Sequence, residues 1–264
     1  MWDATQYLRF GGERARPFSD LLARVGPDKP GFVIDMGCGP GNLTAWLAER
    51  WPSASVLGVD SSPEMIEAAR EHDAPGLSFM RDDVRYWKPQ AMPDVIVSNA
   101  VLQWVPEHRE LLAEWAGWLC AGGWLGIQVP GNFEQPSHAI MRELAGSPRW
   151  SALLRDVNLT RQSADPADYA ELLARAGCEV DAWETTYLHI LHGDNPVLEW
   201  IKGTGLRPVL DVLDDEQAAD FLAEYGERLR VAYPPRPFGT VFPFRRVFAV
   251  AHRPRLNRLS RPAS

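Results

Sequence analysis

The sequence predicts an α/β fold in which helices cover both faces of a parallel β-sheet. Short apolar runs alternate with helical patterns from residue 32 to residue 129, and this order of elements is typical of such a sheet. Glycines stand directly after the first apolar run, where a strand must turn sharply into a helix. The region after Pro130 breaks the alternation and indicates additional segments attached to the same domain.

Five apolar runs are expected to form buried strands, at residues 32–35, 55–60, 77–80, 94–98 and 124–129. Helices are expected between them, at residues 42–50, 62–70 and 109–119. In the first of these helices Leu43, Trp46 and Leu47 recur at helical spacing. Ser62 supplies an N-cap for the second helix, and Pro63 occupies its first helical position.

Residues after Pro130 are expected to build covers around the sheet. Helical stretches fall within two inserts, 131–165 and 192–240, which we expect to form a lid over a substrate pocket. Between the inserts come a helix over 167–176, ended by Gly177, and a strand over 179–191. A last strand is expected at 246–252. The main domain then spans 31–254, preceded by a helical cover at 1–30, amphipathic at 18–25, and followed by a disordered tail at 255–264.

Composition excludes several classes of function. The formal net charge of −8 is unfavourable for a nucleic-acid partner, which requires a basic surface. No apolar window approaches the length of a membrane span, and the N-terminus lacks the pattern of a signal peptide. Cys38, Cys120 and Cys178 are odd in number and far apart, which argues against disulfides and a metal site. We therefore expect a cytosolic protein with no metal, nucleic-acid or membrane partner.

The segment 33–42 carries the main functional signal. A strand leads into glycines at positions 37, 39 and 41, and Asp35 precedes the first glycine by two residues. A dinucleotide-binding loop would place its third glycine where Asn42 stands. The spacing therefore disfavours a dinucleotide and suits S-adenosylmethionine, which has an ammonium group and no pyrophosphate. A tight turn that binds no ligand is the alternative.

Polar residues after the next two strands fit the rest of such a cofactor. Asp60 ends the second strand, at the position where related sheets place an acid on ribose hydroxyls, and Ser61 lies beside it. After the third strand, Asp83 is expected to accept a hydrogen bond from the adenine amino group, with Val84 along the ring. The alternatives are a helix-capping role for Asp60 and two solvated acids at positions 82 and 83.

The fourth strand ends at Asn99, on the edge of the sheet where the site is expected. Trp104 follows shortly afterwards and is expected to form a wall beside the adenosine or the substrate; a plain core role is the alternative.

These pieces, in this order and at these distances, resemble the class I S-adenosylmethionine-dependent methyltransferases over residues 31–130. The resemblance implies a Rossmann-like sheet of seven mostly parallel strands, with the last strand, here 246–252, antiparallel. It also implies S-adenosyl-L-methionine as cofactor and S-adenosyl-L-homocysteine as product. The residues expected to hold the methionine part are Asp35, Gly37, Cys38, Gly39, Gly41 and Asn42, while Asp60 would hold the ribose and Asp83 the adenine.

A narrower resemblance spans nearly the whole chain and concerns the trans-aconitate 2-methyltransferases. The similar segments are 2–10, 13–17, 98–104, 141–143, 176–181, 185–189 and 203–208. One departure occurs at 242–246, where Arg245 and Arg246 stand in place of a single expected arginine. The resemblance implies O-methylation of a carboxylate of trans-aconitate, or of a close small polycarboxylate, to a monomethyl ester.

The residues agree with that chemistry. A carboxylate is already ionised at pH 7, so its methylation requires no general base. Arginines outside the cofactor region are expected to hold the acid, because a guanidinium can bind a carboxylate through two hydrogen bonds. The expected substrate residues are Tyr7, Arg9, Arg142, Tyr187, Arg207, Arg245 and Arg246, with Arg207 as the leading candidate. His189 is expected to be a structural residue, and a role as a general base is the alternative.

Three other functions fit part of the sequence. The nearest is a methyltransferase of the same fold that acts on a phenol, a quinone precursor or a fatty acid, which would be favoured by an apolar pocket without arginines. A nicotinamide-dependent oxidoreductase is disfavoured by Asn42 at the third glycine position. A non-catalytic S-adenosylmethionine sensor could use the same inserts as a lid, and turnover of any acid would exclude it.

Overall fold

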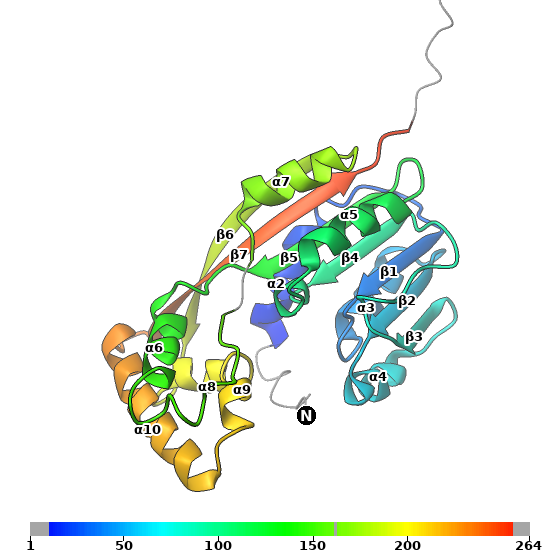
Figure 1. Ribbon diagram of the computed structural model, residues 1–264. Coiled ribbons are helices and arrows are strands. Elements are labelled where there is room, and N and C mark those ends of the chain that lie inside the picture. The colour runs from blue at the N-terminus through cyan, green and yellow to red at the C-terminus, as the bar shows by residue number, and fades with distance from the viewer. Residues whose placement is uncertain (1–10, 161–162, 256–264) are drawn as a thin grey trace, which may run out of the picture.

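The computed structural model describes residues 11–160 and 163–255, and its strands form one mixed sheet (Figure 1). The strand order is β3-β2-β1-β4-β5-β7-β6. Strands β1 to β5 run parallel to one another, and β7 is antiparallel to both β5 and β6. The predicted Rossmann-like sheet of seven strands with an antiparallel last strand is confirmed. The strands are β1 (Phe32–Met36), β2 (Ser55–Asp60), β3 (Leu77–Arg81), β4 (Val95–Asn99), β5 (Trp124–Pro130), β6 (Glu179–Leu191) and β7 (Thr240–His252).

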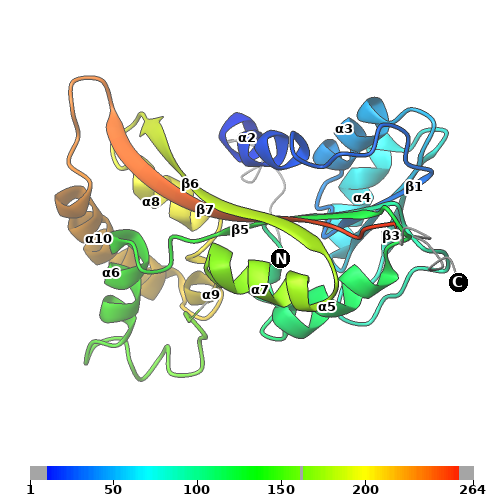
Figure 2. The ribbon, with the colours of Figure 1, turned by 90° about the horizontal axis from the view of Figure 1, so that it is seen from above.

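Helices lie on both faces of this sheet, as Figure 2 shows with the sheet seen along its edge. On one face lie α2 (Gly11–Leu22), α3 (Asn42–Arg50) and α4 (Pro63–Ala69), the last continuing into the 3-10 turn η1 (Arg70–His72). On the other lie α5 (His108–Trp118) and α7 (Pro166–Arg175). Between β4 and α5 the chain forms a second 3-10 turn, η2 (Leu102–Trp104).

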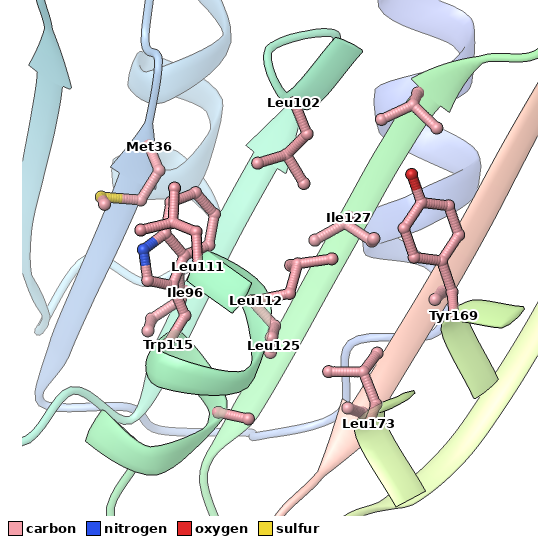
Figure 3. Close-up of a cluster of buried hydrophobic side chains, with 14 of the residues drawn as sticks. Met36, Ile96, Leu102, Leu111, Leu112, Trp115, Leu125, Ile127, Tyr169 and Leu173 are labelled. Carbon is pink, nitrogen blue, oxygen red and sulfur yellow. The ribbon is translucent and has the colours of Figure 1, made fainter. Parts of the chain in front are cut away.

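The core beneath α5 and α7 is built from side chains that alternate along the strands (Figure 3). Ile96 and Ile127 project from β4 and β5, and they meet Leu112 and Trp115 of α5. Burial of such side chains stabilises the fold by about 1.5–3 kcal/mol each. This packing fixes the carboxyl ends of β1, β4 and β5 relative to one another, and those ends carry the expected site residues.

The opposite face is covered by α2 and α3. Phe18 and Leu21 of α2 are fully buried and pack in one cluster with Val33 of β1 and Phe248 of β7. The N-terminal segment therefore contributes a helix to the sheet's own core. Its observed bounds, Gly11–Leu22, begin earlier than the amphipathic stretch expected at 18–25.

Apart from α7, the helices after β5 gather at the far end of the long antiparallel pair formed by β6 and β7 (Figure 1). They are α6 (Pro136–Ala145), α8 (Pro196–Lys202), α9 (Arg207–Leu210) and α10 (Asp215–Ala232). They share a second hydrophobic cluster with β7, in which Trp200, Phe221 and Phe242 are fully buried. The Tyr225 hydroxyl donates to the Ser137 carbonyl at 2.7 Å and joins α10 to α6.

The last strand is longer than expected, because β7 begins at Thr240 and not at residue 246. Pro243 obscured this in the sequence, since proline lacks the N–H of a regular strand ladder. In the structure, Pro243 pairs with Leu188 of the edge strand β6. Among the described residues, no helix is both long and apolar enough to cross a membrane.

Candidate active site

The turn between β1 and α3 requires glycine at each of its three alternate positions. Gly37, Gly39 and Gly41 all have positive φ, at 82°, 55° and 81°. A Cβ on Gly37 would overlap Val101, and one on Gly41 would lie 2.9 Å from Ala69 and Phe79. A Cβ on Gly39 would meet nothing within 4 Å. The first and third glycines therefore allow close packing, whereas the second faces open space at the carboxyl edge of the sheet.

Asp60 joins this loop to the end of β2. One carboxylate oxygen accepts from the Gly39 N–H and the other from the Ser62 N–H, each at 2.9 Å. Burial raises the pKa of Asp60, while these backbone donors act in the opposite direction. The N-cap of α4 is Ser62, which accepts from the Met65 N–H at 3.2 Å. Asp60 is therefore not the helix cap, and its oxygens retain acceptor capacity toward a ligand.

A cavity of about 350 Å³ opens above the loop. Eight of the expected cofactor residues line it: Gly37, Gly39, Asp60, Ser61, Asp83, Val84, Asn99 and Trp104. Six further lining residues were not anticipated from the sequence: Pro40, Met65, Arg85, Ala100, Val101 and Val105. The open space at Gly39, beside a carboxylate that ends β2, fits the methionine part and the ribose of S-adenosylmethionine.

Four expected cofactor residues do not line this cavity: Asp35, Cys38, Gly41 and Asn42. Asp35 is buried beneath the loop and accepts a 2.7 Å hydrogen bond from the Thr44 hydroxyl. Burial raises the pKa of Asp35 to about 7, with the nearby Asp60 adding to the rise. Asp35 thus supports the loop from below.

The Asp83 carboxylate, which was expected to accept a hydrogen bond from the adenine amino group, is paired with an arginine in the structure. Arg85 holds its carboxylate through hydrogen bonds to both oxygens, the shortest 2.6 Å long. This pairing lowers the pKa of Asp83. Asp83 and Val84 nevertheless lie in the cavity wall, where the sequence placed them.

A second cavity adjoins the first through three shared residues, Asn99, Ala100 and Trp104. Ala100 adopts a positive φ of 58°, which is unusual for a residue with a Cβ and often marks a functional site. The Ala100 carbonyl accepts from the Gln103 amide at 2.6 Å. The wall between the cavities is therefore a strained turn at the end of β4.

Of the expected substrate residues that the structure describes, Arg246 alone lines the second cavity. Its guanidinium is buried, lies 4.3 Å from the centre of the Phe244 ring, and donates to Gln128 at 3.5 Å. Arg245 directly precedes Arg246 on β7, and its side chain points away from the cavity. It pairs with Glu184 and Asp165, at 2.5 and 2.7 Å. The two adjacent arginines thus separate into one that faces the cavity and one that braces the outer face.

Arg142, Tyr187 and Arg207, which were also expected to bind the substrate, do not line this cavity. Arg142 donates to the Phe133 carbonyl and to Glu134, at 2.6 and 3.0 Å. The Tyr187 hydroxyl donates to Asp20 at 2.5 Å, and burial raises its pKa. Arg207 begins α9 and is not among the cavity residues, although Thr204 and Gly205 are. The expected positions of Tyr7 and Arg9 lie outside the described residues.

The remaining lining residues of the second cavity were not singled out from the sequence, because they are scattered along the chain, although Gln103, Thr204 and Gly205 lie in segments similar to the family. They are Gln103, Pro130, Asn132, Phe133, His138, Trp200, Ile201, Thr204, Gly205 and Phe244. The nearest available signal was that the helical inserts should face the carboxyl edge of the sheet. His189 does not line the cavity and stacks on Trp200, with ring centres 4.9 Å apart. Within residues 11–160 and 163–255, no three His, Cys, Asp or Glu side chains gather closely enough to hold a metal ion.

The strand order, the glycine turn and the strand-end carboxylate define a class I S-adenosylmethionine-dependent methyltransferase, and a family model described as a methyltransferase domain matches residues 10–182. The trans-aconitate 2-methyltransferase of Rhodococcus jostii (strain RHA1) is 58% identical over 95% of this chain and 99% of that protein. The enzyme of that name from Streptomyces avermitilis is 54% identical over 96% and 97% of the two chains. The chain belongs to the trans-aconitate 2-methyltransferase family.

A solved structure shows the same fold at much lower sequence similarity. Phosphoethanolamine N-methyltransferase 2 of Haemonchus contortus, in complex with S-adenosyl-L-methionine, matches with a TM-score of 0.56 and 17% identity. The match covers 90% of this chain and 52% of that one.

Proposed function

We propose that the protein transfers a methyl group from S-adenosylmethionine to a carboxylate of trans-aconitate, giving a monomethyl ester. One observation carries the choice of an acidic acceptor: the buried guanidinium of Arg246 lines a cavity that adjoins the cofactor cavity. No acidic side chain lines that cavity among the described residues. The names of the two relatives, over nearly the full chain, support trans-aconitate as the acid.

The reaction places few chemical demands on the protein. The sulfonium of the bound cofactor supplies an electrophilic methyl group, and the acceptor carboxylate is ionised at neutral pH. The residues then have to align the two and exclude water. Transfer would take place where Asn99, Ala100 and Trp104 separate the cavities, because among the described residues these three line both.

For the cofactor, we propose that the backbone at Gly37 and Gly39 receives the methionine part and that Asp60 accepts from the ribose hydroxyls. The exposed space at Gly39 and the position of Asp60 at the loop support this assignment. Asp83 and Val84 would lie along the adenine.

The helices of the two inserts are proposed to form the lid over the acceptor. The observation that supports a lid is that His138 of α6, Trp200 of α8 and the turn at Thr204 all line the second cavity. We also propose that the protein acts in the cytosol, since Cys38, Cys120 and Cys178 are free thiols.

The test is a methyl-transfer assay with the purified full chain, S-adenosylmethionine and a panel of di- and tricarboxylates, read out by mass spectrometry. We expect a mass increase of one methyl group on trans-aconitate and an equal amount of S-adenosylhomocysteine. Uncharged aromatic and fatty-acid acceptors belong on the same panel. If trans-aconitate stays unmodified while an uncharged acceptor is methylated, the proposed substrate is wrong.

A further inference from the structure

The buried amide of Asn132 has no hydrogen-bonding partner within the described part of the protein. Its side chain is 1% exposed, and neither its oxygen nor its nitrogen has a partner there. Leaving a polar group buried and unpaired is unfavourable, so such groups usually serve a ligand or water. Asn132 lines the second cavity. We propose that Asn132 is a specificity-determining residue that binds a carboxylate of the acceptor; the inference rests on the proposed function.

The fold places Asn132 on the same side of the sheet as Arg246. Pro130 ends β5 and is directly opposite Arg246 of β7. At the next position, Gly131 faces Arg245: a Cβ there would lie 2.9 Å from the Arg245 guanidinium. Because side chains alternate along an extended chain, Asn132 returns to the side of Arg246. Both residues line the second cavity.

An amide and a guanidinium form a suitable pair for one carboxylate. The Asn132 nitrogen can donate an N–H to one oxygen, while Arg246 donates to the same group and supplies the charge. A carboxylate bound there would satisfy the amide nitrogen, which has no partner in the part of the chain that the structure describes. Two neighbouring amides of the same wall, Asn99 and Gln103, also have an unpartnered oxygen among the described residues, so several of the unsatisfied buried polar atoms lie at this cavity.

Asn132 and Arg246 lie away from the wall at which the acceptor carboxylate would be methylated. Methyl transfer requires an acceptor oxygen at the shared wall of Asn99, Ala100 and Trp104, whereas Asn132 and Arg246 line the second cavity only. The carboxylate that they bind is therefore a different one from the carboxylate that is methylated. In this arrangement Asn132 selects acids with at least two carboxylates.

Two substitutions test the inference. Asn132→Leu keeps the size and removes the amide, and Asn132→Asp keeps the shape and adds a negative charge. We expect kcat/KM for trans-aconitate to fall at least tenfold in the first variant and further in the second. The affinity for S-adenosylhomocysteine, measured by calorimetry, should stay within about twofold. The Tm of Asn132→Leu should be unchanged or higher, because an unpaired buried amide has been removed.

Gln90→Glu is the matched control for added charge, since Gln90 is exposed in the segment between β3 and β4 and lines neither cavity. Its kcat/KM should equal that of the unsubstituted protein. A third measurement uses acids that lack one carboxylate. For those that the unsubstituted protein still methylates, Asn132→Leu should cause a smaller loss than it does for trans-aconitate.

The outcomes separate this inference from the proposed function. If trans-aconitate is methylated and Asn132→Leu keeps kcat/KM within twofold, the inference is overturned and the proposed function stands. If another polycarboxylate is the substrate and Asn132→Leu loses activity toward it, the inference stands and the proposed substrate is wrong. A fall in Tm of several degrees in Asn132→Leu, with equal losses on every acid, would show that Asn132 is structural. If no acid is methylated, both fail.

Discussion

Replacement of Arg246 by methionine should reduce acceptor use strongly while leaving cofactor binding intact. Methionine keeps much of the volume of the buried side chain against Phe244 and removes the charge. The hydrogen bond to Gln128 is long, at 3.5 Å, so its loss contributes little. Removal of one cation from a buried carboxylate pair costs about 2–5 kcal/mol, which corresponds to a roughly 30- to 5,000-fold fall in kcat/KM. Arg246→Lys should recover only part of this loss, because an ammonium lacks the two-pronged geometry of a guanidinium.

Arg245→Ala provides the matched control, since Arg245 is the neighbouring arginine of β7 and faces the other side. Arg245 forms ion pairs with Glu184 and Asp165, and both carboxylate side chains are exposed. Loss of these pairs should therefore lower the free energy of unfolding by at most about 1 kcal/mol. Initial rates against trans-aconitate, together with calorimetry of S-adenosylhomocysteine, measure both effects. The reasoning is refuted if Arg246→Met retains kcat/KM within twofold, or if Arg245→Ala loses as much as Arg246→Met.

The remaining predictions concern the cofactor loop, the pH dependence of stability and the pH dependence of kcat. Gly39→Ala should lower the free energy of unfolding by only about 1–2 kcal/mol, because of the positive φ. It should weaken cofactor binding at least tenfold, since the new methyl group enters the cavity. Equal affinity by calorimetry would place the cofactor elsewhere. Asp60→Asn should also weaken the cofactor at least tenfold, as a charged acceptor is worth about 1.5–3 kcal/mol, and unchanged affinity would remove Asp60 from the site. The pKa of Asp35 in the folded protein is about 7, above its ordinary value of 3.8. Its favourable contribution to the free energy of unfolding is therefore complete below pH 4 and is lost as pH rises through 7. Asp35→Asn should therefore gain stability relative to the unsubstituted protein by up to about 4 kcal/mol between pH 4 and pH 8 in urea unfolding, and a pH-independent difference would contradict this. The kcat at saturating cofactor should remain flat from about pH 6.5 to 9, because the carboxylate nucleophile needs no base; a limb near pH 7 that disappears in His189→Gln would contradict this.

Local sequence was sufficient for the cofactor side of the protein. Periodicity located the strands and helices from 32 to 130, because each is a short segment whose buried face recurs at a fixed spacing. The glycine positions were equally accessible, since a sharp turn with positive φ at residues 37, 39 and 41 excludes most other residues. Placement at the carboxyl ends of parallel strands also brought Asp60 and Asn99 to one edge without any knowledge of their partners.

The acceptor side depended on contacts between segments far apart in the chain. The sequence by itself offered several arginines as candidates, and it ranked Arg207 first. Only the tertiary structure separated them: the alternation of β7 turns Arg246 toward the cavity and gives Arg245 to Glu184 and Asp165. Asn132 had no local signature at all, because its significance lies in being buried just beyond the end of β5 without a hydrogen-bonding partner among the described residues. A side chain's direction and burial are set by the strands and helices that pack around it, and these come from distant parts of the chain: Arg245 and Glu184 are 61 positions apart, and Arg246 and Gln128 are 118 apart.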